Sequence, residues 1–203
     1  FTAATLLIAF NILSQMGNVG DSLRHAAFQV ASIMTTTGFA TTDFDQWPEF
    51  SGTLLVMLMF IGACAGSTGG GIKVSRILMY MKTIKKELGI LIHPRSVKIV
   101  MMDGKKLDHP VVRAANIFLI SYAGILVASI LLLTIDNFDF TTNVTAVISA
   151  LNNIGPGLSL VGPAGNFAFF SGFSKYVLMF DMLAGRLEIF PMLLLFVPYT
   201  WKK

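Results

Sequence analysis

The stretch TTTGF, residues 35–39, decides the fold class that this 203-residue sequence predicts. It follows a short apolar helix predicted over residues 23–34, and it breaks that helix with three hydroxyl side chains and a glycine. NNIGP at residues 152–156 ends a second short helix, predicted over residues 144–151, in the same way. A helix needs about 20 residues to cross ~30 Å of hydrocarbon, so both helices are too short to span it. We interpret them as re-entrant segments of a membrane protein.

The composition also indicates a membrane protein. Water-soluble domains carry roughly 25% charged residues, whereas this chain has 13% charged and 54% hydrophobic residues and a mean hydropathy of +0.71. The net charge of +4 does not indicate nucleic acid binding, because ten of the fifteen basic residues lie between Lys73 and Arg113 and not over a binding face. The single cysteine, Cys64, excludes a disulfide framework and a zinc site built from cysteines alone.

One long apolar run predicts a membrane-spanning helix with little ambiguity. Residues 114–135 (AANIFLISYAGILVASILLLTI) are uncharged, rich in leucine and isoleucine, and free of proline. The chain starts at Phe1 instead of a methionine, and no charged region precedes apolar residues 1–10, so its start is not a signal peptide. We expect the chain to be a fragment that begins inside a hydrophobic helix.

The order of the segments repeats, which predicts two tandem units. Each unit contains a span, a re-entrant helix, a loop and a second span. In chain order, the segments of the first unit are residues 1–15, 23–34, 35–42 and 53–65, and those of the second are residues 111–134, 143–152, 153–162 and 174–196. Gly38 corresponds to Gly155 at an offset of 117 residues, and Gly66 corresponds to Gly185 at an offset of 119.

Polar residues before each short helix predict where it starts. Asp21 and Ser22 precede the first helix, and Thr141, Thr142 and Asn143 precede the second. Their side-chain oxygens can accept hydrogen bonds from the free N–H groups of the first helical turn. Each helix would therefore begin at a polar cap and end at its polar loop.

The distribution of charge predicts the orientation. The connection at residues 72–113 carries ten basic residues against three acidic ones, whereas the connections near the re-entrant loops are acidic. Their acidic residues are Asp43, Asp45, Glu49, Asp136 and Asp139. By the positive-inside rule the long connection is cytoplasmic. Both loops then open to the outside, below an acidic vestibule that concentrates cations.

The two loops have the features of a cation filter. Each short helix points the partially negative end of its dipole at its loop. One glycine in each loop, Gly38 or Gly155, permits a φ that other residues avoid, so that successive carbonyls can face one axis and replace the water shell of an ion. Several such loops must surround the axis, because dehydrating an ion is costly. A single copy would fit an ordinary glycine turn between packed helices, and the second copy favours a filter.

Three stretches resemble a known family. ASIMTTTGFATTD (residues 31–43), GACAGSTGGGIK (residues 62–73) and NNIGPG (residues 152–157) closely resemble the Trk/Ktr/HKT superfamily of potassium transporters, in particular its bacterial TrkH branch. The resemblance implies an all-α integral membrane fold, in which four repeats of span, re-entrant pore loop and span form a pore like that of a potassium channel. The chain would hold the third repeat at residues 1–72, with its first span truncated, a cytoplasmic connection at residues 73–108, and the fourth repeat at residues 109–203.

The resemblance further implies that backbone carbonyls of both loops bind the potassium ion and that the chain carries no organic cofactor. The implied ligands are Thr36, Thr37, Gly38 and Phe39 in the first loop, and Asn153, Ile154 and Gly155 in the second. Asn153 stands where a threonine would add a hydroxyl ligand, which predicts looser selectivity. Some members of the superfamily have serine in place of glycine in the first repeat and move sodium, so sodium transport stays open.

The glycine-rich run at residues 62–71 lies where the second span should cross the membrane centre. One interpretation is a phosphate-binding loop, because Gly66 and Gly71 have the required spacing. That loop needs a lysine followed by serine or threonine, and the sequence has Ile72 and Val74 at the corresponding places. We therefore reject a phosphate-binding loop.

Two interpretations of the run remain. Gly62, Gly66 and Gly70 fit a small-residue face on which helices pack. An unwound loop below the filter fits residues 67–71, because several poor helix formers follow one another there. The resemblance favours the second interpretation, in which the loop is a movable gate. The gate residues would be Gly66, Ser67, Thr68, Gly69, Gly70 and Gly71.

Arg186 lies near the middle of the predicted span at residues 174–196, with Asp181 and Glu188 on either side. A charge at that depth costs roughly 2.5–3.5 kcal/mol, so it should face protein or water. One interpretation is an internal ion pair that joins helices. The resemblance supports another, in which the arginine lies beside the gate loop and opposes cations until the loop moves. Pro191 would kink the helix below it.

The resemblance also implies the location and the partners. The location is the bacterial inner membrane, crossed several times. The partners would be the first two repeats of the same polypeptide, a second copy in a homodimer, and a cytoplasmic nucleotide-binding regulatory subunit that contacts residues 72–113. Basic and apolar residues alternate at residues 73–86, which predicts a helix among lipid headgroups.

Asp103-Gly104 predicts a small hairpin in the same connection. No nucleic acid partner is expected.

These observations predict potassium uptake through a filter that the glycine-rich loop and a regulatory subunit gate. An intramembrane protease or a lipid-modifying enzyme would need a nucleophile and a base facing each other at depth, and Ser67 has no intramembrane histidine partner, so we do not expect an enzyme. A sodium- and potassium-permeable member of the same superfamily is an alternative, and so is a non-conducting structural subunit. The histidines lack the spacing of metal ligands: His25, His93 and His109.

Overall fold

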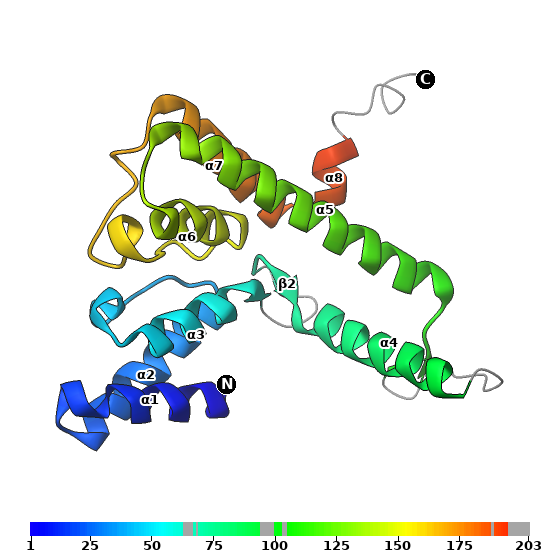
Figure 1. The fold of residues 1–203 in the computed structure, drawn as a ribbon, viewed down its shortest axis with the longest axis horizontal. Helices are drawn as coiled ribbons and strands as arrows, with labels where there is room; N and C mark the ends of the chain where they lie inside the picture. Colours follow the sequence, from blue (N-terminus) through cyan, green and yellow to red (C-terminus); the bar gives the residue numbers. More distant parts are fainter. Residues whose placement is uncertain (63–66, 68, 94–99, 103–104, 188, 195–203) are drawn as a thin grey trace.

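The computed structural model describes residues 1–62, 67, 69–93, 100–102, 105–187 and 189–194, and helices dominate these residues (Figure 1). The α-helices are α1 (Thr2–Met16), α2 (Val19–Met34), α3 (Glu49–Phe60), α4 (Val74–Ile92), α5 (His109–Leu133), α6 (Phe140–Leu151), α7 (Gly172–Arg186) and α8 (Ile189–Leu194). The 3₁₀ turns are η1 (Phe44–Gln46), η2 (Thr134–Asp136) and η3 (Ser159–Val161). The strands are β1 (Ile61–Gly62), β2 (Ile72–Lys73), β3 (Met101–Met102) and β4 (Lys105–Lys106).

The helices form two groups that meet at α6. Helices α1, α2 and α3 pack on one another, and α5, α6 and α7 do the same. Helix α3 contacts α6, so the short helix of the second group joins the first group (Figure 1). Helix α4 leads away from both groups toward the start of α5.

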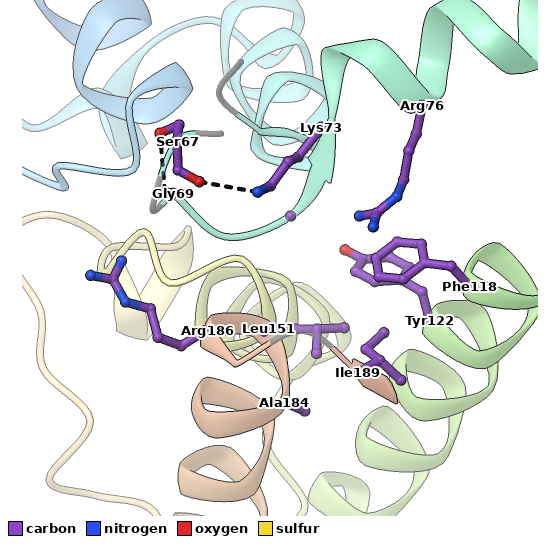
Figure 2. Close-up of a pocket in the computed structure, with 12 residues that line it drawn as sticks. Ser67, Gly69, Lys73, Arg76, Phe118, Tyr122, Leu151, Ala184, Arg186 and Ile189 are labelled. Carbon is purple, nitrogen blue, oxygen red and sulfur yellow. Dashed lines mark hydrogen bonds between the residues drawn. The ribbon is translucent and has the colours of Figure 1, made fainter. Parts of the chain in front are cut away.

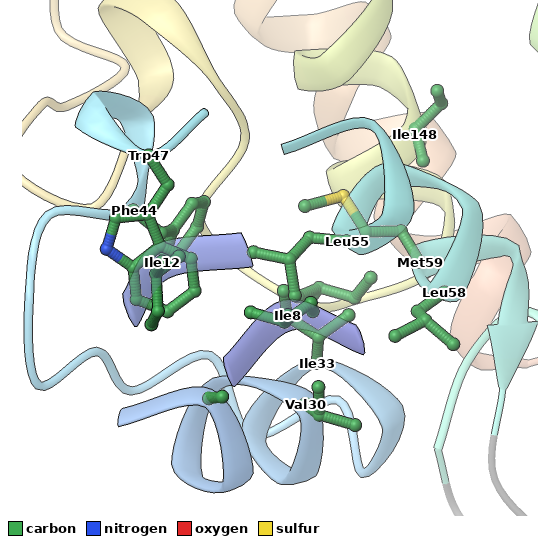
Figure 3. Packing of buried hydrophobic residues seen from close by; sticks show 12 residues of the cluster. Ile8, Ile12, Val30, Ile33, Phe44, Trp47, Leu55, Leu58, Met59 and Ile148 are labelled. Atoms are coloured by element: carbon green, nitrogen blue, oxygen red, sulfur yellow. The ribbon is translucent and has the colours of Figure 1, made fainter. Parts of the chain in front are cut away.

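The largest hydrophobic core belongs mainly to α1, α2 and α3. Figure 3 shows Ile8 and Ile12 of α1 packed with Ile33 of α2 and Leu55 of α3. Two buried residues of the second group, Ile148 on α6 and Ile154 in the loop after it, belong to the same core. Because apolar burial drives folding, this shared core fixes the second loop against the first group of helices.

Helix α6 is enclosed by protein along nearly its whole length. From Thr142 to Leu151, only Val144 is not fully buried. The helix is buried around its whole circumference, including the polar residues Thr142, Asn143, Thr145 and Ser149, and it is too short to span a membrane. A re-entrant helix must be enclosed in this way because lipid cannot satisfy its polar groups. Two further clusters cover it, one around Leu133 and Phe170 and one around Phe118 and Ala184.

One described helix, Pro110–Asp136, is long and apolar enough to cross a membrane, with a hydropathy of 2.4. It contains the run at residues 114–135, so the predicted helix is present and has the length and composition of a span. The other apolar helices among the described residues are shorter: Thr2–Met16, Glu49–Phe60 and Phe140–Leu151. The third of these is the predicted re-entrant helix before NNIGP.

The prediction of one continuous helix over residues 174–196 is wrong. Helix α7 ends at Arg186, and a separate helix, α8, begins at Ile189. Pro191 is the third residue of α8 and so lies in its first turn, where the missing N–H of a proline costs no helical hydrogen bond. The proline therefore lies at the start of a new helix and does not kink a continuous one.

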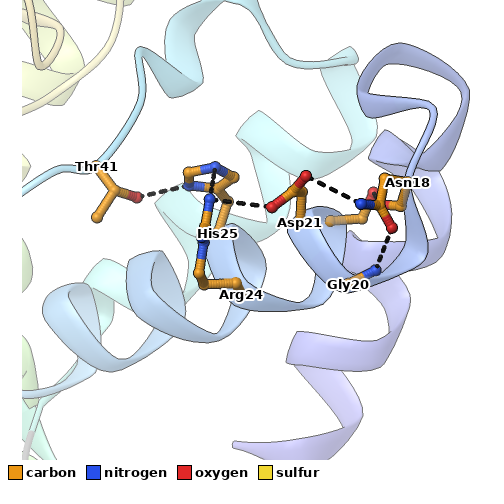
Figure 4. A network of polar contacts seen from close by, with 7 residues as sticks. Asn18, Gly20, Asp21, Arg24, His25 and Thr41 are labelled. Carbon is orange, nitrogen blue, oxygen red and sulfur yellow. Dashed lines mark hydrogen bonds and ion pairs between the residues drawn. The ribbon is translucent and has the colours of Figure 1, made fainter.

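The first re-entrant helix also starts earlier than predicted. Gly17, with a φ of 65°, ends α1, and Asn18 caps α2 by accepting a 3.0 Å hydrogen bond from the Gly20 N–H. Asp21, the predicted cap, lies in the first turn and binds Arg24 at 3.0 Å (Figure 4). The correction arises because α2 begins as soon as the chain has turned at Gly17.

Helix α6 starts earlier for a similar reason. Asp139 is its cap and accepts a 2.9 Å hydrogen bond from the Thr142 N–H, so the predicted caps Thr141, Thr142 and Asn143 lie inside the helix. The Thr142 hydroxyl also donates to Asp139. These hydrogen bonds favour the charged carboxylate and hold the pKa of Asp139 below its usual range.

The prediction of a small hairpin around Asp103-Gly104 is confirmed. Strand β3 pairs with β4 in an antiparallel register, with Met102 opposite Lys105, and the Asp103-Gly104 turn itself lies outside the described residues. Lys82 on α4 donates a 2.8 Å hydrogen bond from its Nζ atom to the Met101 carbonyl. The hairpin is thereby attached to the basic helix that precedes it.

We predict that Asp139→Ala lowers the free energy of unfolding of the full-length protein by about 1 kcal/mol, whereas Asp139→Asn, which keeps an acceptor oxygen, changes it little. Because the pKa of Asp139 is depressed in the folded state, the charge-dependent share of this stability is present above the unfolded pKa of about 3.9 and is lost as the pH falls through the folded pKa. Urea unfolding in detergent at neutral and acidic pH measures both effects. Equal stabilities of wild type and Asp139→Ala would contradict the cap.

Candidate ion-binding loops

The loops after α2 and α6 have the same backbone conformation. Thr36 and Asn153 both have a φ of 55°, in the left-handed region that non-glycine residues rarely adopt. Two residues later, Gly38 and Gly155 have φ values of 79° and 115°. The residue between each pair has a negative φ, so the sign alternates along both loops. A non-glycine residue in the left-handed region costs about 1–3 kcal/mol, which indicates that the surrounding structure enforces this conformation.

The hydrogen bonds of the loops repeat at the same offset. The Thr37 N–H donates to the Ser32 carbonyl at 2.9 Å, and the Ile154 N–H donates to the Ser149 carbonyl at 3.0 Å. Each of these bonds joins a loop residue to a carbonyl in the last turn of the preceding helix. The offset of 117 residues that aligns the glycines therefore aligns the backbone around them.

Two buried serines in the last turns of α2 and α6 bind the backbones of the loops that follow, and the sequence did not point to them. The Ser32 hydroxyl donates to the Phe39 carbonyl at 2.6 Å. The Ser149 hydroxyl accepts from the Gly155 N–H at 3.0 Å. Each serine precedes its loop glycine by six residues, and that shared spacing is the signal that could have identified them.

This backbone can present a row of carbonyls to a cation. In an extended chain successive carbonyls alternate between opposite sides, and alternating the sign of φ turns the peptide planes so that carbonyls can face one side. The same loops begin at the C-terminal ends of α2 and α6, where the helix dipole is negative. A site of this kind needs no acidic side chain, and the described part of the chain holds no group of three or more His, Cys, Asp or Glu residues that could bind a metal ion.

The two loops lie against each other. A Cβ atom built on Gly38 would lie 2.0 Å from the Ile154 carbonyl oxygen, and one built on Gly155 would lie 4.0 Å from the Gly38 Cα atom. Ile154 is buried, whereas Phe39 is 71% exposed. Of the seven sequence-predicted ligands, the structure thus brings the two glycines and Ile154 into direct contact.

The Asn153 side chain points away from its own loop. Its amide donates from Nδ2 to the Met182 carbonyl on α7 at 3.1 Å. In the first loop the Thr37 hydroxyl instead lies 2.7 Å from the Thr35 hydroxyl. The two loops therefore share a backbone but not their side-chain interactions.

The glycine-rich run is not helical where the structure describes it. Helix α3 ends at Phe60, and β1 pairs with β2 in parallel, with Ile61 opposite Ile72. Gly62 and Gly70 lie against each other, since a Cβ on Gly62 would be 2.2 Å from the Gly70 carbonyl oxygen. The interpretation of this run as a helix face built of small residues is therefore wrong for Gly62 and Gly70. Gly66 and Thr68 lie outside the described residues.

The run contacts the base of the second loop at Asn152, a residue that sequence analysis did not select. A Cβ on Gly70 would be 2.3 Å from the Asn152 carbonyl oxygen, and one on Gly71 would be 2.8 Å from its Oδ1 atom. Asn152 is fully buried. Its Oδ1 accepts from the Tyr122 hydroxyl at 2.9 Å, and its Nδ2 donates to the Ile148 carbonyl at 2.8 Å. Only glycine permits so close an approach.

A small cavity lies between this run and α5, α6 and α7 (Figure 2). Its volume is about 50 Å³, which is room for a few water molecules and too small for an organic cofactor. Lys73, Arg76 and Arg186 line it. Lys73 donates from Nζ to the Ser67 carbonyl at 3.1 Å. Arg76 stacks 4.0 Å from the centre of the Phe118 ring.

Arg186 is the last residue of α7 and therefore does not lie in the middle of a helix. Its side chain extends away from Arg76 and Tyr122 in Figure 2. Asp181 is fully buried and accepts a 2.7 Å hydrogen bond from the Ser129 hydroxyl on α5. Asp181 thus joins α7 to α5 through a serine, and Glu188 lies outside the described residues.

Gly185 lets α7 pack directly on the end of α6. A Cβ atom there would lie 1.9 Å from the Leu151 carbonyl oxygen and 2.9 Å from the Asn153 Nδ2 atom. The position next to Arg186 is therefore in contact with the base of the second loop. Sequence analysis selected Gly185 from the repeat, and this contact is the physical reason for the glycine.

The chain matches a family of cation transport proteins over nearly its whole length. The profile of the family TrkH, described as a cation transport protein, matches residues 3–203. The Trk system potassium uptake protein TrkH of Salmonella typhimurium is 39% identical over 203 residues, which cover 98% of this chain and 42% of that protein. The TrkH protein of Vibrio parahaemolyticus is 44% identical over 182 residues, which cover 90% of this chain and 37% of that protein.

A solved structure shows the same fold. The crystal structure of the potassium transporter TrkH from Vibrio parahaemolyticus matches with a TM-score of 0.90 and 40% sequence identity. The match covers 99% of this chain and 43% of that chain. The chain thus spans less than half the length of the relatives that it matches.

We predict that Gly185→Ala destabilises the full-length protein by about 1–3 kcal/mol, because the added methyl group pushes α7 away from the Leu151 carbonyl. Gly124→Ala is the matched control, since nothing lies within 4 Å of a Cβ at Gly124 on α5. Thermal unfolding in detergent measures both variants. Equal melting temperatures for the two variants would show that α7 does not depend on this close approach.

Proposed function

Because the chain belongs to the TrkH family of cation transport proteins, we propose that its two loops form half of a potassium-selective filter across the bacterial inner membrane. The paired backbone of the loops carries the proposal. Both combine a left-handed residue, a glycine two positions later and a helix C-terminus. A repeated and strained conformation of this kind in two segments that touch is expected where one ligand is bound from two sides.

The ligands that we propose are main-chain oxygens. They are those of Thr36, Thr37, Gly38 and Phe39 in the first loop and of Asn153, Ile154 and Gly155 in the second. The Phe39 carbonyl already accepts from the Ser32 hydroxyl, so its share in binding the ion is the smallest of the seven. The contact between Gly38 and the Ile154 carbonyl supports a shared axis, because it leaves no space for side chains between the loops. Two further loops, from the first two repeats of the same polypeptide, would complete the ring of oxygens that a dehydrated ion needs.

We propose that the glycine-rich run and Arg186 gate the pathway. The run is unwound where it is described, and it packs through Gly70 and Gly71 on Asn152, directly below the filter loop. Arg186 lines the cavity beside it. A positive charge at this place opposes cations by Coulomb repulsion. Release of the run from Asn152 would then open the pathway.

The remaining proposals concern the assembly. Residues 1–72 and 109–203 are the third and fourth repeats, and residues 73–108 form the cytoplasmic connection. A nucleotide-binding regulatory subunit contacts that connection, where α4 places basic residues. The whole transporter is a homodimer in the inner membrane. The names of the relatives as Trk system potassium uptake proteins support potassium as the transported ion.

We predict that the full-length protein restores growth on low potassium to bacteria that lack potassium uptake, and that Gly38→Ser and Gly155→Ser both lower the preference for potassium over sodium. Gly38→Ser should lower the preference more, because its Cβ would clash with the Ile154 carbonyl and its φ is also unfavourable for serine. At Gly155 only the φ is unfavourable, since the nearest atom is 4.0 Å from a Cβ. Rubidium and sodium flux into proteoliposomes measures the preference.

Gly172→Ser is the control for these variants, since nothing lies within 4 Å of a Cβ at Gly172. It should keep wild-type flux and wild-type preference. Wild-type preference in both loop variants would refute the filter. Sodium flux equal to potassium flux in the wild type would favour a sodium- and potassium-permeable transporter, and no flux of either ion would favour a structural subunit.

For the gate, we predict that Arg186→Ala raises the basal potassium leak several-fold in the absence of a regulator, because it removes one of the three positive charges that line the cavity. Arg186→Lys keeps a charge and should leak less than the alanine variant. Flux from proteoliposomes loaded with rubidium measures the leak. An unchanged leak in Arg186→Ala would exclude this role of the arginine.

A further inference from the structure

We propose that Asp45 is a positioning residue that fixes the distance between the two loops at their outer ends. It accepts a 2.6 Å hydrogen bond, through Oδ1, from the backbone N–H of Ser159, which is 114 residues away in the sequence. The role rests on the proposed function, since the property that it would control is ion selectivity. Neither the proposed ligands nor the proposed gate includes Asp45.

The chain before Asp45 holds it in a fixed place. Asp45 lies in η1, which Asp43 caps by accepting from the Asp45 N–H at 3.3 Å. Gln46 donates to Asp43 at 2.9 Å. Phe44 and Trp47, which flank Asp45 and Gln46, are buried in the core of the first group of helices. The carboxylate of Asp45 is therefore presented from a rigid turn, and little entropy is lost when it binds a partner.

The partner is a strained piece of backbone. Ser159 has a φ of 58°, another non-glycine residue in the left-handed region. Its two neighbours are also held by side chains, because the Leu158 N–H donates to the Thr145 hydroxyl at 3.0 Å and the Leu160 N–H lies 3.4 Å from the Thr142 hydroxyl. Three consecutive N–H groups thus find side-chain acceptors. Asp45 is the one acceptor that does not come from α6.

This bond connects the two groups of helices. It joins η1, which follows the first loop, to η3, which follows the second. The other direct contacts between the loops are packing contacts, such as that of Gly38 with Ile154. Gly162 adds to the packing, since a Cβ there would lie 3.4 Å from the Asp45 Cβ atom.

The position of the bond makes it effective on the loops. Asp45 follows Gly38 by seven residues, and Ser159 follows Gly155 by four. The bond therefore joins the two segments of the chain that follow the loops of the proposed filter. Discrimination between ions that differ in size depends on how firmly the oxygens are held, so a restraint at this point would affect selectivity more than total flux.

Asp45 could affect transport through its charge or through its hydrogen bond, and the two effects predict different results. An acidic residue at the mouth can also raise flux by attracting cations, and that effect depends only on charge. Glu49 is a matched residue, because it is exposed like Asp45 and lies four residues away, and no hydrogen bond or ion pair of its side chain is found in the described residues. Asp45→Asn removes the charge and keeps an acceptor oxygen, and Asp45→Ala removes both.

The experiment measures the ratio of rubidium to sodium flux through the full-length protein in proteoliposomes, together with total rubidium flux. We expect Asp45→Ala to lower the ratio several-fold, Asp45→Asn to keep most of it, and Glu49→Ala to leave it unchanged. Ser159→Gly relieves the backbone strain and keeps the N–H, so it should also retain the ratio. Size-exclusion profiles and melting temperatures confirm that each variant is folded.

Three results would overturn the inference. A folded Asp45→Ala variant with the wild-type ratio would show that the bond does not control selectivity. An Asp45→Asn variant as defective as Asp45→Ala would show that the charge matters and not the bond. Equal losses in Asp45→Ala and Glu49→Ala would show a general effect of the acidic mouth. Failure of the proposed function is distinguishable, since the wild type itself would then move no rubidium.

Discussion

The structure depends on one constraint, which is that polar backbone inside a membrane must find polar partners in protein or in a bound ion. Lipid cannot supply these partners. The loops after α2 and α6 satisfy the constraint in the same way, because a buried serine behind each loop binds its backbone and the two glycines bring the loops into contact. In the proposed filter the carbonyls that remain bind the cation, and the enclosed helix α6 with its shared hydrophobic core keeps them in place.

Sequence patterns predicted the part of the fold that depends on local signals. The apolar run at residues 114–135 and the two short helices before TTTGF and NNIGP are all present. The offset of 117 residues between Gly38 and Gly155 also holds for the backbone around them. Glycine and hydroxyl residues after one apolar helix fit an ordinary turn, so the signal came from their recurrence at the same place in two units.

The features that sequence analysis missed depend on tertiary contacts. Several polar residues precede each helix, and which one becomes the cap is decided by where the previous segment ends, as Asn18 and Asp139 show. Asn152 looked like one more residue of the loop, and its importance comes from the close approach of Gly70 and Gly71. The break after Arg186 likewise separates α7, which packs on α6 through Gly185, from α8, which packs on α5 and α7 in the cluster around Phe118.

The most direct measurement of the central claim is the location of bound ions in the full-length protein. Crystals grown with rubidium in place of potassium would be examined by anomalous diffraction. The account predicts an anomalous peak between the two loops, within bonding distance of main-chain oxygens from residues 36–39 and 153–155. Peaks found only at acidic side chains of the mouth, with none between Gly38 and Gly155, would contradict it.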